Sequence, residues 1–189
     1  DVDYTVDERL HSVTLYGNTL PFSVLFESEY KGKFAQNFDV VKKDGNTVVI
    51  KGLKDKLGNE QPDREVTLGQ MTATPYGKLC IVRGPAFGTW ENEKVHVSRI
   101  SMERASGRFM GELSASEYDK ETSLIVLSVN DANTNRADNI LSTLYDTYKE
   151  DVVENKNRVA LNTAKFIDER IQIIGRELSS VESQLATFK

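Results

Sequence analysis

The stretch IDERIQIIGRELSSVESQLATFK, residues 167–189, decides the fold of the C-terminal part of this chain. Its apolar residues recur at alternating steps of three and four, which is the heptad spacing of a helix that packs along a narrow line. The same spacing continues backwards to Asn157. We call this line the seam; its members are Asn157, Ala160, Ala164, Ile167, Ile171, Ile174, Leu178, Val181, Leu185 and Phe188. The pattern predicts a helix whose seam contacts another helix.

Helical periodicity begins near Asp131, and no proline follows that residue. Asn130, Asp131, Asn133 and Thr134 supply side chains of the kind that cap a helix N-terminus. A continuous helix from Arg136 to the end of the chain would be roughly 80 Å long at 1.5 Å per residue. A compact domain of this size is much narrower, so we expect the helix to project from it.

The apolar stripe of this helix changes width along its length. Val159, Phe166 and Ile173 each stand one position before a seam residue and widen the stripe, as Val152 does before Val153 on the extension of the same line, whereas Ser180 holds the equivalent place further on. A wide stripe is typical of packing against a sheet, and a narrow line is typical of one or two partner helices. We therefore expect the first half of the helix to pack on the rest of the chain and the second half to extend into a coiled coil.

The residues before this helix alternate with a period of two, as in β-strands. Asp44-Gly45-Asn46 separates two β-rich segments and predicts a hairpin, and residues 75–77, Pro-Tyr-Gly, predict another turn. Ser123–Val129 reads SLIVLSV, a nearly continuous apolar run that favours a strand in the middle of a sheet. A short helix is predicted around residues 101–109. The class is therefore α+β: a mostly antiparallel, β-rich base domain over residues 1–130, then a long projecting helix over residues 131–189, a truncated coiled coil.

Composition excludes several classes of function. The formal charge of −5 offers no basic surface to neutralise phosphates, so we expect no nucleic-acid partner. Cys80 is the only cysteine, and with the two histidines it cannot form a usual zinc site, so neither a metal nor another cofactor is expected. No apolar run approaches the roughly 20 residues that cross a bilayer. The chain starts at Asp1 and stops within the heptad pattern, and we expect it to be part of a longer protein.

The candidates for catalysis are weak. TATPYGKL, residues 72–79, lacks the first glycine and the Ser/Thr of a phosphate-binding loop and favours a turn between strands. His11 and His96 stand near no recognisable nucleophile motif. Asp168 and Glu169 lie on a helix that offers no cleft for a sugar, and Cys80 is interpreted as a small buried packing residue. We expect no catalytic residue in this chain.

Two stretches of the C-terminal half resemble the Wzz, or chain-length-determinant, family of polysaccharide co-polymerases. They are SLIVLSVNDANTNRADNILSTLYDTY and KNRVALNTAKFIDERIQIIGRELSSVESQLATFK. TLYGNTLPFSVLF and TPYGKLCIV resemble the base of that family more loosely. The resemblance is strongest to the branch whose members often continue into a cytoplasmic tyrosine autokinase. One difference is Thr134, which stands where the family usually has proline at the helix start.

The resemblance implies the periplasmic domain of an inner-membrane protein, held by two membrane spans that are absent from this chain. It implies a homo-oligomer that controls the length or export of capsular polysaccharide, exopolysaccharide or the O-antigen of lipopolysaccharide together with the polymerase and export machinery. The growing polysaccharide is a further candidate partner. This part would be non-catalytic, and the parent protein would carry the tyrosine-protein kinase domain if it belongs to that branch.

Alternatives remain open at this point. The seam is covered by a return helix of the same polypeptide, by neighbouring protomers, or by both, and Asn157 would set the register at some cost in stability. A periplasmic adaptor of a secretion or efflux system also combines β domains with a coiled coil, but it inserts a helical hairpin within its β module. An enzyme acting on surface glycans is the third reading.

Overall fold

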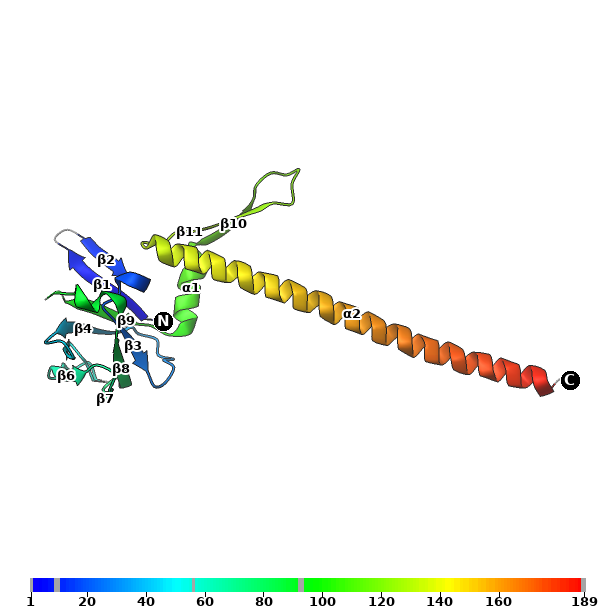
Figure 1. Ribbon diagram of the computed structural model, residues 1–189, viewed down its shortest axis with the longest axis horizontal. Coiled ribbons are helices and arrows are strands. Elements are labelled where there is room, and N and C mark those ends of the chain that lie inside the picture. The colour runs from blue at the N-terminus through cyan, green and yellow to red at the C-terminus, as the bar shows by residue number, and fades with distance from the viewer. Residues whose placement is uncertain (1, 9–10, 56, 92–93, 188–189) are drawn as a thin grey trace. The chain divides into compact units, whose positions relative to one another are not determined.

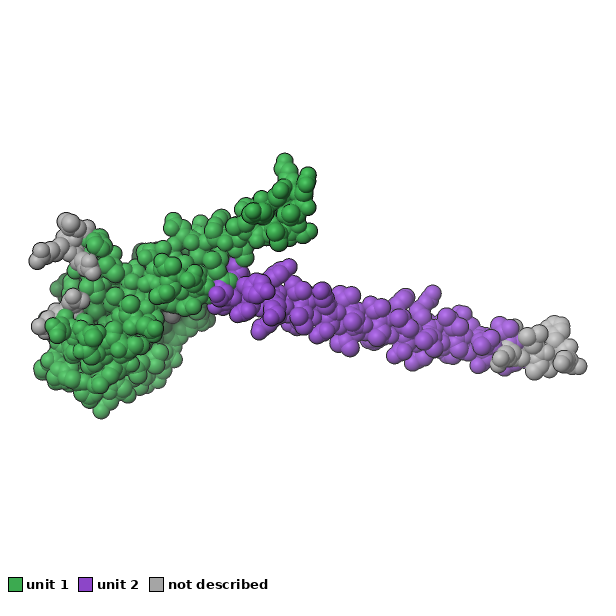
Figure 2. All heavy atoms as spheres, turned by 45° about the horizontal axis from the view of Figure 1, so that its top comes forward, with its two compact units in different colours: residues 1–141 green, residues 142–189 purple. Residues whose placement is uncertain are grey.

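A computed structural model describes residues 2–8, 11–55, 57–91 and 94–187 (Figure 1). The chain divides into two compact units, residues 1–141 and residues 142–189, which Figure 2 colours green and purple. The first unit holds the strands and a short helix, and the long C-terminal helix α2 (Thr134–Thr187) begins in it and makes up the second. Antiparallel sheets with a long C-terminal helix confirm the predicted α+β class.

The larger sheet has the strand order β2-β1-β9-β4-β5-β6, with every neighbouring pair antiparallel. Its strands are β1 (Val2–Glu8), β2 (His11–Leu15), β4 (Gln36–Lys42), β5 (Thr47–Lys51), β6 (Arg64–Thr67) and β9 (Val95–Arg99). The hairpin predicted between β4 and β5 is confirmed. The Asp44 carboxylate closes it by accepting hydrogen bonds from the backbone N–H groups of Asn46 and Thr47, at 2.8 and 2.7 Å.

A smaller antiparallel sheet has the order β3-β8-β7, formed by β3 (Phe22–Phe26), β7 (Met71–Thr74) and β8 (Gly77–Arg83). The turn predicted at residues 75–77 joins β7 to β8. Gly77 has a φ of +102°, a conformation that side chains other than glycine rarely adopt. The segment that was compared with a phosphate-binding loop is therefore a hairpin turn.

The hydrophobic core contains side chains from both sheets. Phe22 of β3 lies at its centre, with ring centroids 5.8 Å from Tyr4 of β1 and 5.2 Å from Trp90. Trp90 follows the short 3₁₀ helix η2 (Pro85–Gly88), which packs near the 3₁₀ helix η1 (Gly17–Thr19). The hydroxyl of Tyr4 accepts a hydrogen bond from the backbone N–H of Val24 at 2.8 Å, and burial raises the pKa of this phenol.

The core also corrects the interpretation of Cys80. Leu79 and Ile81 are fully buried, so their side chains point into the core. Cys80 lies between them in the strand, so its side chain points to the other face, where it is only half-buried. A strand alternates its side chains between two faces, and the larger apolar pair takes the inner one.

Helix α1 (Met102–Glu112) confirms the short helix predicted after β9. Its N-terminus is capped by Ser101, whose hydroxyl accepts a hydrogen bond from the N–H of Arg104 at 3.4 Å. Ala105 is buried, which fixes the face of α1 that meets the sheet.

Ser123–Val129 is not in the middle of a sheet, contrary to the prediction. The strand β11 (Ile125–Val129) pairs with β10 (Leu113–Glu117) and with no other described strand. Ile125 is 69% exposed, and Leu127 is 38% exposed. The prediction was wrong because an apolar run indicates affinity for apolar surroundings but does not say which strand will pair with it. Here β11 pairs with the strand just before it in the sequence, β10, and the two are joined by a turn at residues 118–124.

Helix α2 runs without a break through the polar segment at residues 149–158 and through Gly175. A Cβ atom at Gly175 would meet nothing within 4 Å, so this glycine is not required by close packing. In the described part of the chain, no helix combines the length and the apolar character needed to cross a membrane.

Candidate functional site

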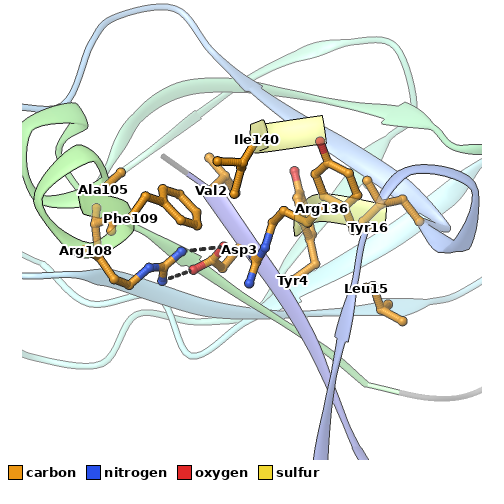
Figure 3. Close-up of a pocket in the computed structure, with 12 residues that line it drawn as sticks. Val2, Asp3, Tyr4, Leu15, Tyr16, Ala105, Arg108, Phe109, Arg136 and Ile140 are labelled. Atoms are coloured by element: carbon orange, nitrogen blue, oxygen red, sulfur yellow. Dashed lines mark hydrogen bonds and ion pairs between the residues drawn. The ribbon is translucent and has the colours of Figure 1, made fainter. Parts of the chain in front are cut away.

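A cavity in the first unit lies between β1, α1 and the first turns of α2 (Figure 3). Its volume is about 240 Å³. Polar side chains and aromatic rings line one part of it, and aliphatic side chains line the rest. The aliphatic members are Val2, Leu15, Leu20, Ile100, Ala105 and Ile140. We refer to it below as the α1–α2 cavity.

An ion-pair chain crosses the polar part of the α1–α2 cavity. Arg108 of α1 donates from Nη1 to Asp3 Oδ2 at 2.6 Å, and Arg136 of α2 donates from Nη1 to Asp3 Oδ1 at 2.9 Å. Arg136 also donates from Nε to both oxygens of Asp131, at 3.0 and 2.8 Å. Figure 3 shows Asp3 between the two guanidinium groups, so one carboxylate of β1 connects both helices to the sheet.

Burial and charge act in opposite directions on Asp3. Its burial would raise the pKa of the carboxyl, but the hydrogen bond from Arg108 and the positive charges of Arg108 and Arg136 outweigh it and lower that pKa. The hydrogen bond to Asp3 in turn raises the pKa of Arg108. Asp3 and Arg108 are therefore both charged at neutral pH.

Aromatic rings flank the same charges. The ring of Phe109 has its centroid 4.7 Å from the guanidinium carbon of Arg108 and 5.6 Å from that of Arg136. These are cation–π distances, and they hold Phe109 at the border between the polar and apolar parts of the cavity. Tyr16, directly after β2, also lines the cavity, and its hydroxyl accepts a hydrogen bond from Asn139 Nδ2 at 3.2 Å.

The start of α2 is held by the segment that leads into it. Asn133 is the N-cap: its Oδ1 accepts from the N–H of Arg136 at 3.2 Å, and its backbone oxygen accepts from the N–H of Ala137 at 3.0 Å. Thr134 is then the first helical residue, and the capping role falls to its neighbour. Asn133 Nδ2 also donates to the backbone oxygen of Thr14 at 3.3 Å. Among the predicted capping residues, Asn133 and Asp131 therefore fix the direction in which Arg136 points.

All of the described seam residues lie on α2 and are exposed. Side-chain exposure is 50% at Ile167, 62% at Ile171 and 58% at Ile174 and Leu178, and Val181 is 51% exposed. Asn157, Ala160 and Ala164 are exposed as well. The surroundings of the Leu185 side chain, and Phe188 altogether, lie outside the described residues. The apolar residues that widen the stripe include Val159 and Phe166, which are 63% and 60% exposed.

His96 pairs with an acidic side chain of the neighbouring strand. His96 Nδ1 lies 2.8 Å from Asp39 Oδ1, and Asp39 is the residue opposite it on β4. Lys94 Nζ lies 3.2 Å from the other oxygen of the same carboxylate. His11 lies exposed on β2. Within the described ranges, no group of three or more His, Cys, Asp and Glu side chains is placed to hold a metal ion.

The α1–α2 cavity was not predicted from the sequence. Asp131 and Arg136 stand at the predicted start of the helix, so the sequence indicated their position in the fold. Asp3, Arg108 and Phe109 come from distant parts of the chain and belong to no recognisable motif. The seam and the cavity are separate features, since the seam lies wholly within residues 142–189 and the cavity wholly within residues 1–141. No protein-family model matches this chain, and no curated protein matches it.

Proposed function

We propose that this chain is the periplasmic part of a Wzz-type polysaccharide co-polymerase, a membrane-anchored protein that regulates the length or export of a surface polysaccharide. The proposal rests on the residues that resemble this family, from Ser123 to the end of the chain. The single structural observation that carries it is the exposed seam of α2, of which Ile171 and Leu178 are 62% and 58% exposed. A long, exposed apolar line of this kind is typical of a surface that contacts another protein segment.

The cover is a coiled coil. In this proposal α2 continues as part of a longer helical hairpin or bundle, and the seam packs against a return helix, against neighbouring copies of the chain, or against both. The faces of α2 beside the seam carry charges of both signs, such as Lys165 and Glu169, which stand four positions apart and whose charged atoms lie 4.0 Å apart. Mixed charge beside an apolar seam suits contacts between helices in water.

The mechanism is architectural. The sheets form a base, the Asp3–Arg136 ion pair fixes the first turn of α2 to β1 at 2.9 Å, and the seam joins helices in the assembly. The number and angle of the protomers then set the geometry that the polymerase and the growing polysaccharide meet. The chain breaks and forms no covalent bond in this account, and it works from the periplasmic side of the inner membrane. A tyrosine kinase domain would belong to another part of the parent protein.

The experiment that tests this function is deletion of the parent gene in its own bacterium, followed by complementation. The length distribution of the surface polysaccharides is measured on gels. The proposal expects the modal length to change or the long chains to disappear on deletion, and to return with the complete gene. An unchanged distribution, together with a defect in export of proteins or small toxic compounds, would favour the adaptor alternative instead.

A further inference from the structure

We propose that the α1–α2 cavity binds one uncharged pyranose ring, a single sugar unit of a polysaccharide. The inference rests on the proposed function in one respect, namely that a polysaccharide reaches this domain. The cavity itself is independent of the seam. Its size, its walls and its charge balance each point to this class of ligand.

The volume limits the ligand to a small molecule. At about 240 Å³ the α1–α2 cavity lies below the roughly 300–1,000 Å³ of sites that enclose drug-sized compounds. One sugar ring is therefore a better match than an oligosaccharide, whose neighbouring units would remain outside. Phe109, Tyr16 and Ile140 are each half-buried, so part of the lining is open to solvent.

The walls have the two kinds of surface that a pyranose ring has. One face of such a ring carries C–H groups and packs against aromatic and aliphatic side chains, while its hydroxyl groups need hydrogen bonds. Phe109 and Ile140 supply the apolar contact. The Phe109 ring stands beside the guanidinium groups, so a sugar that stacks on this ring has its edge next to the charged groups (Figure 3).

The polar groups suit hydroxyls. A sugar hydroxyl both donates and accepts a hydrogen bond, so it pairs well with a carboxylate next to a guanidinium. Asp3 offers accepting oxygens, and Arg108 and Arg136 offer donating N–H groups within the same chain of contacts. The Tyr16 hydroxyl already accepts from Asn139, and its own hydrogen is available to donate.

The charge balance selects an uncharged sugar over an acidic one. The two arginines are matched by Asp3 and Asp131, and the carboxylate of Glu112 adds further negative charge near Arg108. A phosphate or uronate entering the cavity would have to compete with Asp3 for both guanidinium groups. An uncharged ring can join the network without breaking an ion pair.

The test uses saturation-transfer NMR on the whole 189-residue chain. The probes are the methyl glycosides of glucose, galactose and mannose, with glucuronate and inorganic phosphate as charged comparisons. We expect transfer to the ring C–H protons of at least one methyl glycoside, competition among those that bind, and no competition by glucuronate or phosphate. Binding of the charged probes in place of the neutral ones would overturn the proposal, and so would the absence of any binding at tens of millimolar sugar.

Two variants locate the binding. Ile140→Trp fills the cavity from α2 and should abolish the signal, whereas Leu161→Trp places the same side chain at a 71% exposed position of the same helix and should leave it unchanged. Phe109→Leu keeps the apolar surface and removes the aromatic face, and it should weaken binding by about fivefold. Circular dichroism checks that each variant is folded. Equal binding to the wild type, Ile140→Trp and Phe109→Leu chains would place the sugar elsewhere and overturn the assignment.

Failure here and failure of the proposed function give different results. If the cavity binds no sugar but deletion of the parent gene still alters polysaccharide length, the assembly role stands and only the cavity assignment falls. If deletion leaves the polysaccharide unchanged while the methyl glycosides bind and Ile140→Trp abolishes the signal, the cavity is a sugar site in a protein of another function.

Discussion

Arg136, in the first turn of α2, donates a hydrogen bond from Nη1 to Asp3 Oδ1 of β1 at 2.9 Å, across 133 positions of sequence. The Arg136 side chain is 14% exposed, and that of Asp131, its second partner, is 4% exposed. Little solvent therefore screens these charges. The contact joins the N-terminal strand of the chain to the start of its longest helix, and Arg108 extends it to α1.

Asp3→Asn should lower the free energy of unfolding at neutral pH by about 1–3 kcal/mol, because it removes the carboxylate that the largely buried Arg136 shares with the more exposed Arg108. Urea denaturation followed by circular dichroism measures the change. Asp63→Asn is the matched control: its ion pair with Lys51 at 3.5 Å is about half exposed, and its removal should cost at most about 0.5 kcal/mol. Equal effects of the two substitutions would contradict a structural role for Asp3.

The same variant should change the acid sensitivity of the chain. The pKa of Asp3 is lower in the folded state than the value of about 3.9 usual for an unfolded chain. The stability that it contributes is therefore complete above about pH 4 and is lost as the pH falls through its folded pKa. The difference in stability between wild type and Asp3→Asn should shrink below about pH 4. Asp44 and Asp55 also have lowered pKa values, so part of the acid sensitivity should persist in the variant.

Two substitutions at the start of α2 should change the free energy of unfolding in opposite directions. Asn133→Ala removes the N-cap oxygen and should cost about 1 kcal/mol. Thr134→Pro should be neutral or stabilise by about 0.5–1 kcal/mol, because the first helical position needs no N–H donor and proline fixes its φ. Asn162→Ala, at an exposed position inside α2, is the control for the loss of an asparagine and should not destabilise. Strong destabilisation by Thr134→Pro would show that α2 begins elsewhere.

Arg99 is a charged residue that the fold buries. It is 2% exposed and forms no ion pair with a described carboxylate; its guanidinium carbon lies 3.8 Å from the ring centroid of Phe26 and 5.4 Å from that of Tyr30. It donates to the backbone oxygen of Ser28, but its buried Nε has no hydrogen-bond partner among the described residues. Burial accordingly lowers its pKa.

Arg99→Met should therefore leave the free energy of unfolding unchanged or raise it by about 1 kcal/mol, because methionine fills the space without the cost of burying a charge. Arg64→Met, at an exposed arginine that donates to the backbone oxygen of Ala73, is the control and should lower stability by less than about 1 kcal/mol. A loss of more than about 2 kcal/mol in Arg99→Met would mean that aromatic stacking compensates fully for the buried charge.

The sequence predicted what local chemistry decides. The Asp44 hairpin, the Gly77 turn, the short helix α1 and the long helix α2 follow from turn residues, capping residues and periodicity over a few positions. The place of β11 did not follow, because an apolar strand carries no information about its partner. Nor did the α1–α2 cavity, because a lone Asp3 and a lone Arg108 become a pair only after the chain has folded across more than a hundred residues.

A substitution in the seam can distinguish an effect on the stability of this chain from an effect on its assembly. Ile174 is 58% exposed, so Ile174→Lys in this chain should change the free energy of unfolding by no more than about 0.5 kcal/mol. Asn162→Lys makes the same change of charge on another face of α2 and is the control. A large loss of stability in Ile174→Lys alone would mean that Ile174 is already covered within this chain.

The most direct test of the assembly claim places these two substitutions in the complete parent protein, in a strain that lacks the wild-type gene. The length distribution of the surface polysaccharide is then measured on gels, with the amount of protein checked by immunoblotting. The proposal predicts that Ile174→Lys shifts the modal length or abolishes it, as deletion does, and that Asn162→Lys leaves it unchanged. A wild-type length distribution in the Ile174→Lys strain, at a normal protein level, would contradict it.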